Sequence, residues 1–182
     1  MNTSFNINKK AALIICAGIL TKIIPHLPNF SPEIVFALYL GMKSSKGLAW
    51  MYILFMAIVS DILFGWQNPA YPSFGSWTIF TYSALLAIGW AGAYIKKKAF
   101  GAAFMWLSCA ANIAYWLWTN FGTWLVGNMY PHTITGFVAC YTLALPFLAN
   151  SLAASFAWCA IIVACEYYIP KNKLKHEAYI TR

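Results

Sequence analysis

Residues 48–65, LAWMYILFMAIVSDILFG, decide the fold, because Asp61 is the single charged residue among these eighteen. A helix that crosses the hydrocarbon core of a bilayer needs about 20 mainly apolar residues, so this segment predicts a transmembrane helix. An ionisable side chain inside such a helix is costly and marks a functional site by default. Asp61 is therefore the first candidate site residue.

The whole composition agrees with this segment. The chain has 182 residues, of which 62% are hydrophobic, 18% aromatic and only 9% charged. A soluble domain carries about 25% charged residues, because its surface faces water. We therefore expect an all-α, polytopic membrane helical bundle that lies in the cell (inner or cytoplasmic) membrane, with the lipid bilayer as its main partner.

Six apolar segments, separated by turn-forming residues or charges, predict about six transmembrane helices in one domain of residues 1–182. The segments are residues 11–24, 32–42, 48–65, 77–95, 99–119 and 147–169. The first two are short for a full crossing and could instead form a partly re-entrant hairpin. Residues 133–145 predict a helix at the outer surface, and residues 170–182 a cytoplasmic tail.

The distribution of lysine and arginine predicts the orientation. With both termini cytoplasmic, every cation except Lys22, that is eleven of the twelve, falls on the inner side. This is the bias that cytoplasmic loops of membrane proteins carry. The same clustering explains the net charge of +8 without a basic binding face, so we expect no nucleic acid partner.

The predicted outer loops, residues 25–31, 66–76 and 120–133, differ in kind from the inner ones. They combine prolines, which stiffen a loop, with amide, imidazole and aromatic side chains. Such groups on a rigid frame suit a small-molecule pocket, although an interfacial aromatic belt would explain part of the pattern. The candidate ligand-binding residues here are His26, Asn29, Trp66, Tyr71, Asn120, Trp124 and His132.

Polar residues inside the predicted spans add deeper candidates. Lys22 lies at the depth of Asp61, so we expect these two to pair, either as structural glue or at the base of a pocket. Asn112 predicts an interhelical hydrogen bond or a pocket floor. Glu33 follows Ser31 and Pro32, and this order favours a capped helix start with an acid at its positive end over a ligand contact.

Motifs for cofactors and catalysis do not occur in the sequence. The five cysteines form no C-x-x-C pair, and no phosphate loop, G-x-G-x-x-G or G-x-S-x-G pattern is present. The two outer histidines lack the close spacing typical of metal ligands, so we expect neither a metal nor another cofactor. A protein of this kind that moves a molecule against a gradient would need a separate energising membrane or ATPase module.

Two motifs carry a resemblance. His26-Leu27-Pro28-Asn29-Phe30-Ser31-Pro32 and Thr119-Asn120-Phe121-Gly122-Thr123-Trp124, followed by Tyr130-Pro131 and Cys140-Tyr141, resemble an uncharacterised family of small bacterial integral membrane proteins. At fold level the pattern also resembles the substrate-binding S components of energy-coupling-factor vitamin transporters. That resemblance implies six helices, cytoplasmic termini and a vitamin pocket under the outer loops.

The leading hypothesis is a membrane-embedded protein that binds and transports a small molecule, similar to a vitamin or its precursor, without being an enzyme. One alternative is a membrane-embedded enzyme that uses His26, His132 and Asp61. Another is a non-catalytic subunit of a larger membrane complex.

Overall fold

The computed structural model describes residues 3–70, 72–95 and 101–180, and within them the chain forms seven helices and no strand. The all-α prediction is therefore confirmed for the described residues. The helices are α1 (Thr3–Ile23), α2 (Glu33–Lys43), α3 (Lys46–Gln67), α4 (Thr78–Gly92), α5 (Ala102–Val126), α6 (Ile134–Leu143) and α7 (Leu145–Ile180).

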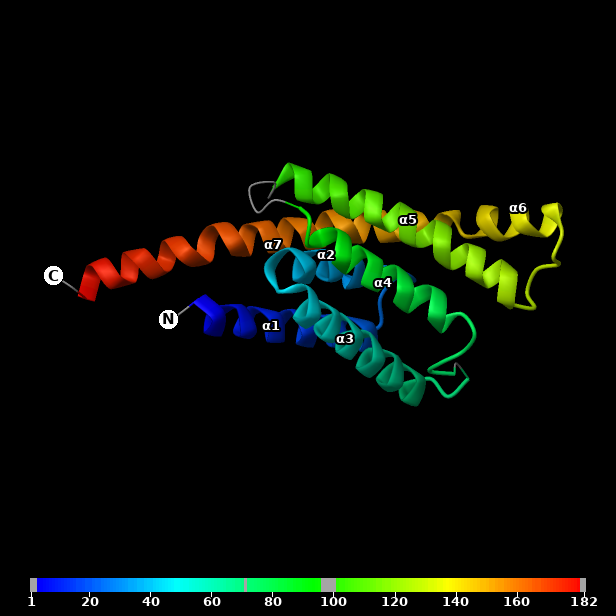
Figure 1. Ribbon diagram of the computed structural model, residues 1–182, viewed down its shortest axis with the longest axis horizontal. Helices are drawn as coiled ribbons and strands as arrows, with labels where there is room; N and C mark the ends of the chain where they lie inside the picture. Colours follow the sequence, from blue (N-terminus) through cyan, green and yellow to red (C-terminus); the bar gives the residue numbers. More distant parts are fainter. Residues whose placement is uncertain (1–2, 71, 96–100, 181–182) are drawn as a thin grey trace.

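The helices run roughly along one long direction, and their turns alternate between two ends (Figure 1). α1 begins and α7 ends at the left of the view, which we call the termini end. The turns that follow α1, α3 and α5 lie toward the right, which we call the loop end. The turn of residues 24–32 lies nearer the middle of the molecule than the other two, because α2 is much shorter than its neighbours.

α2 is the centre of the bundle. All of its residues from Glu33 to Met42 are buried, although the helix has only 11 residues. Glycines let α4 approach it closely: a Cβ atom built on Gly41 would lie 2.0 Å from the carbonyl oxygen of Gly89, and one on Gly92 would lie 2.4 Å from that of Leu38. Small residues at such a crossing allow two backbones to meet.

The outer surface of the bundle is apolar. Large side chains such as Leu13, Met51, Ile79 and Trp106 are between 65% and 71% exposed. Two stretches, Lys46–Gln67 and Ile134–Tyr167, are long and apolar enough to cross a membrane. Exposed apolar surface of this extent marks a binding or membrane-facing region rather than a water-facing one. These observations support an association with the membrane.

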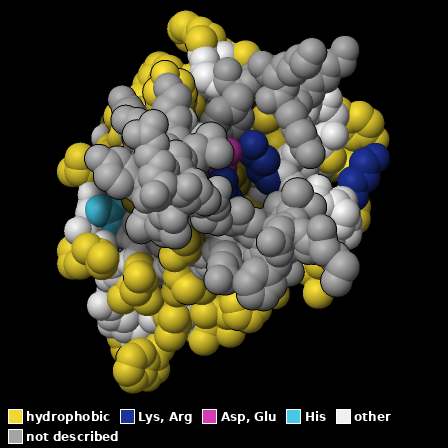
Figure 2. Space-filling model, turned by 90° about the vertical axis from the view of Figure 1, so that its left-hand side faces the viewer, with side chains coloured by type: hydrophobic (Ala, Val, Ile, Leu, Met, Phe, Trp, Pro, Cys, Tyr) yellow, Lys and Arg dark blue, Asp and Glu magenta, His cyan; other side chains and the backbone are white. Residues whose placement is uncertain are grey.

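An ion cluster closes the termini end. Glu166 of α7 accepts hydrogen bonds of 2.6 Å from Lys10 Nζ of α1 and from the Tyr39 hydroxyl of α2, and Lys43 Nζ lies 3.5 Å from its second oxygen. Figure 2, which faces this end, shows lysine side chains beside a carboxylate near the centre and hydrophobic side chains along the flanks. The cluster thus joins α1, α2 and α7 by charge in this half of the bundle.

α5 differs from the helix that the sequence predicts. We expected its span to end near residue 119 and a loop to follow, but α5 continues to Val126. The polar side chains of this stretch hydrogen-bond to carbonyls one turn earlier: Thr119 to Tyr115, Asn120 to Trp116 and Thr123 to Thr119. Because these groups are satisfied within the helix, they do not end it.

α7 also extends further than its predicted span. Its backbone is helical to Ile180, so the described part of the predicted tail, residues 170–180, continues this helix.

Candidate functional site

The loop between α1 and α2 forms one wall of the site. Within it, the Phe30 amide donates to the Leu27 carbonyl at 2.9 Å, and Asn29 adopts a left-handed backbone with φ of 61°. Asparagine is one of the few residues that tolerates this conformation. The start of α7 holds the loop in place, since Asn150 Nδ2 donates to the Pro28 carbonyl at 3.0 Å and Ser151 Oγ to that of Asn29 at 3.1 Å.

Charges from three helices meet beneath this loop. Lys22 Nζ of α1 donates to Asp61 Oδ1 of α3 and lies 3.1 Å from Glu33 Oε1 of α2. The Tyr82 hydroxyl of α4 donates to the second Asp61 oxygen at 2.8 Å. The predicted Lys22–Asp61 pair is confirmed. We call Lys22, Glu33 and Asp61 the charged triad, and it contains one positive and two negative groups.

Glu33 combines its predicted local role with a second one. It begins α2, and its amide donates to Ser31 Oγ at 3.4 Å, in keeping with the expected helix start. Its side chain also belongs to the charged triad, which the sequence did not indicate. A carboxylate at this position interacts favourably with the positive end of the helix dipole.

A cavity of about 830 Å³ lies between this loop, the charged triad and the ends of α3 and α4. Its lining is mixed and includes His26 and Asn29 from the α1–α2 loop, Gln67 and Asn68 at the C-terminal end of α3, and Thr78, Thr81 and Tyr82 from α4. We call it the larger cavity. A volume between about 300 and 1,000 Å³ is typical of small-molecule sites.

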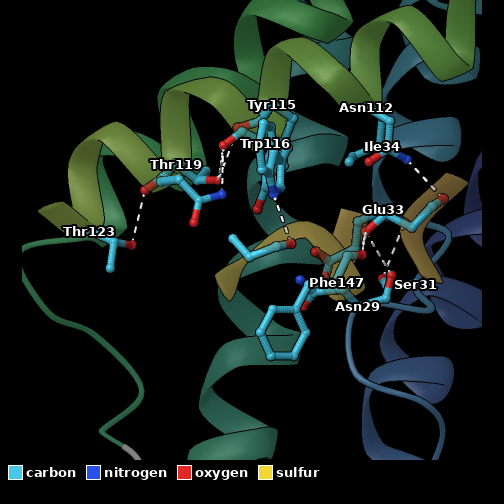
Figure 3. Close-up of a pocket in the computed structure, with 13 residues that line it drawn as sticks. Asn29, Ser31, Glu33, Ile34, Asn112, Tyr115, Trp116, Thr119, Thr123 and Phe147 are labelled. Carbon is cyan, nitrogen blue, oxygen red and sulfur yellow. Dashed lines mark hydrogen bonds between the residues drawn. The ribbon is translucent and has the colours of Figure 1, made fainter. Parts of the chain in front are cut away.

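A second cavity of about 250 Å³ adjoins the first, and we call it the smaller cavity. The two share Asn29, Ser31, Glu33 and Tyr115 in their linings. In Figure 3, Asn112, Tyr115, Trp116, Thr119 and Thr123 extend from α5, opposite Asn29, Ser31 and Glu33. Phe147 and Ser151 of α7 complete the lining. The cavities therefore lie next to each other around the N-terminus of α2.

Asn112 is the most deeply buried polar group of the smaller cavity, with 2% of its surface exposed. Its Nδ2 donates to the Ser151 carbonyl at 3.0 Å and to Ser155 Oγ at 2.7 Å, which confirms the predicted interhelical hydrogen bond. Within the described part of the chain, its Oδ1 has no hydrogen-bond partner. Buried acceptors without a partner are rare in folded proteins.

The structure brings some of the predicted site residues together and leaves others apart. His26 and Asp61 line the larger cavity, Asn112 and Asn120 the smaller one, and Asn29 both. Three other candidates line neither cavity, and a fourth, Tyr71, lies outside the described residues. The three are Trp66, Trp124 and His132.

Trp66 is 82% exposed and lines neither cavity. Trp124 and His132 form an edge contact, with ring centroids 5.6 Å apart, and Trp124 Nε1 donates to the Pro131 carbonyl. These two belong to the junction of α5 and α6. Of the three residues that the enzyme alternative names, His26 and Asp61 line the larger cavity, and His132 lies at this junction.

Among the described residues, no group of three or more His, Cys, Asp or Glu side chains could hold a metal ion.

Several residues of the site were missed in the sequence, although α5 carries a signal for them. Tyr115, Trp116, Thr119 and Thr123 were missed, and they line the smaller cavity together with the predicted Asn112 and Asn120. Their spacing is that of one helix face, with steps of three and four residues. A polar and aromatic stripe of this period inside an apolar helix predicts a face directed at a cavity. No comparable local signal exists for Ser31 or Ser151.

Comparison with known proteins gives a family and no activity. A family model described as a family of unknown function (DUF6580) matches residues 4–177. Neither the curated proteins nor the solved structures include a match to the chain. The predicted kinship with an uncharacterised family agrees with this result.

Proposed function

The chain belongs to this family of unknown function, DUF6580, and we propose that it is a multi-pass membrane protein that binds a small molecule for uptake. The ligand would occupy the larger and smaller cavities, which it would enter from the loop end. The observation that carries the proposal is the convergence of polar side chains from α1, α2, α3, α4, α5 and α7 on two adjoining cavities at one end of an apolar bundle.

We place the termini end on the cytoplasmic side. Lys10, Lys43 and Lys46 lie on the parts of α1, α2 and α3 nearest this end, as the positive-inside bias requires. The turns of the loop end would then face outward. In this arrangement the whole bundle is embedded in the bilayer, with its exposed apolar side chains toward lipid.

The short α2 supports a site within the depth of the membrane. Eleven residues span about 16 Å, roughly half of a hydrocarbon core about 30 Å thick. The loop before α2 therefore dips inward, and its irregular backbone is tolerable only where it is buried in protein or lines a cavity. Transporters place substrate sites at broken helices near the bilayer midplane for the same reason. Uptake against a gradient would then need a separate energising membrane or ATPase module, as expected for a protein that resembles an S component.

Two variants test ligand binding, one at Asn120 in the smaller cavity and one at Asn29, which lines both cavities. Asn120→Ala removes an amide that bonds only to its own helix among the described contacts, and Asn29→Gly removes a side chain while keeping the left-handed backbone. We expect each variant to fold and to bind the retained molecule about five- to tenfold more weakly, since a hydrogen bond contributes about 1 kcal/mol. Native mass spectrometry of gently purified protein measures the retained molecule.

Asn128→Ala, at an exposed amide of the α5–α6 turn, is the matched control and should retain the molecule normally. Unchanged retention in both cavity variants would contradict the proposed site.

A further inference from the structure

The charges around the larger cavity do not balance. Among its described lining residues, the charged groups are Lys22, Glu33 and Asp61, which leaves an excess of one negative charge. Lys22 donates to Asp61, and Tyr82 donates to the other Asp61 oxygen. Glu33 accepts fewer hydrogen bonds than Asp61. Lys22 Nζ lies 3.1 Å from Glu33 Oε1, but this buried oxygen accepts no hydrogen bond within the described part of the chain. Glu33 is thus the carboxylate that retains capacity for another partner.

A second acceptor belongs to Asn112 of α5, which lines the smaller cavity. Asn112 Nδ2 donates to the Ser151 carbonyl, and a carbonyl can only accept, so the orientation of the amide is fixed. Its Oδ1 is therefore an acceptor, and the described residues provide no donor for it. A buried acceptor left unsatisfied costs about 1 to 3 kcal/mol. Both Asn112 and Glu33 line the smaller cavity. Among the described residues the Asn112 oxygen has no donor, and the Glu33 carboxylate has only its ion pair with Lys22.

The smaller cavity also has aromatic side chains in its lining. Tyr115, Trp116 and Phe147 line the same cavity (Figure 3). Aromatic faces attract cations, and the attraction is strongest where water is excluded. The lining of this one small cavity therefore combines a carboxylate, an amide oxygen and aromatic rings. Such groups accept hydrogen bonds and attract positive charge.

We propose that the smaller cavity recognises a positively charged nitrogen group of the ligand, an ammonium or amidinium. Glu33 would balance its charge, and Asn112 Oδ1 would accept one of its N–H groups. The inference rests on the proposed function and adds the class of ligand to it. A volume of about 250 Å³ suits one such group or a single substituted ring, and the larger cavity would take the rest of the molecule.

Three probes of nearly the same shape test the charge preference: benzamidine is cationic, benzamide neutral and benzoate anionic. Binding of each to the purified protein in lipid nanodiscs would be measured by calorimetry, with the natural ligand removed. We expect benzamidine to bind at least tenfold more tightly than benzamide, and benzoate not to bind. Equal binding of the three, or a preference for benzamide or benzoate, would overturn the inference.

The Glu33→Gln variant assigns the preference to a residue. It keeps the size of the side chain and leaves one cation and one carboxylate in the charged triad. Because these two charges balance, we expect the variant to fold. Benzamidine binding should weaken at least tenfold and benzamide binding should change little. Glu166→Gln, the same change in the ion cluster of the termini end, should leave both unaffected. A preference that survives Glu33→Gln would overturn the role of Glu33.

The failure of the inference is distinguishable from the failure of the proposed function. A neutral or anionic probe that binds better contradicts only the charge class, because the cavity still binds a small molecule. If none of the probes binds and purified protein retains no molecule, the proposed function fails as well. The series on the unaltered protein decides the charge class even if the Glu33 variant does not fold.

Discussion

Gly41→Ala should destabilise the protein by about 3 kcal/mol, the upper end of the range for overpacked cores. The new Cβ atom would lie 2.0 Å from the Gly89 carbonyl oxygen, a backbone atom that no side-chain rotation can move away. α2 and α4 would have to separate, and the buried face of α2 would lose its packing. Thermal unfolding of purified protein, followed by tryptophan fluorescence, measures the loss.

Gly47→Ala is the matched control, because the same change there meets no atom within 4 Å among the described residues. Alanine is favoured over glycine in a helix, so Gly47→Ala should be neutral or stabilise the protein by up to about 1 kcal/mol. Equal effects of the two substitutions would contradict the close crossing of α2 and α4.

Lys22→Met should destabilise the protein by about 3 to 5 kcal/mol, the range for removing one partner of a buried ion pair. Glu33 and Asp61 would remain in the bundle without their cation, and both side chains are less than one-fifth exposed. Methionine fills most of the volume of the lysine stem, so the loss would report on charge rather than on packing. Chemical unfolding of the variant in detergent measures the difference.

Two further variants separate charge from position. Lys46→Met removes an exposed lysine that donates to the Tyr94 hydroxyl at 2.9 Å, and it should change stability by at most about 1 kcal/mol. Adding Asp61→Asn to Lys22→Met should recover part of the loss, since residues in one network are not additive. A double variant that is less stable than Lys22→Met alone would contradict the charged triad.

Polar and charged residues, which cost free energy when they are placed inside the membrane, were the most predictable part of the site. Lys22 and Asp61 were paired from their similar depth alone, and the structure joins them. Asn112 was predicted to bond between helices, and it does. In each case a buried polar group must find a partner, so the depth of the residue restricts the choice. Glu33 escaped this reasoning because its position at a helix start already explained it.

Features that depend on three-dimensional convergence were less predictable. Trp66, Trp124 and His132 were grouped with the pocket because they fall in the predicted outer segments, but a common side of the membrane does not bring side chains together. The first two short segments could not be resolved into a full helix and a half-length helix, because a short apolar run fits both. Only the contacts of α2 with its neighbours distinguish them.

Cysteine accessibility in oriented membrane vesicles tests most directly whether the cavities open to the side opposite the lysine clusters. Ser73→Cys places a thiol in the lining of the larger cavity, and Ser45→Cys places one in the exposed turn between α2 and α3. With the unaltered protein and its five cysteines as background, a membrane-impermeant maleimide should label Ser73→Cys in right-side-out vesicles and Ser45→Cys only in inside-out vesicles. The reverse pattern, or labelling of both from the same side, would contradict the proposed uptake site.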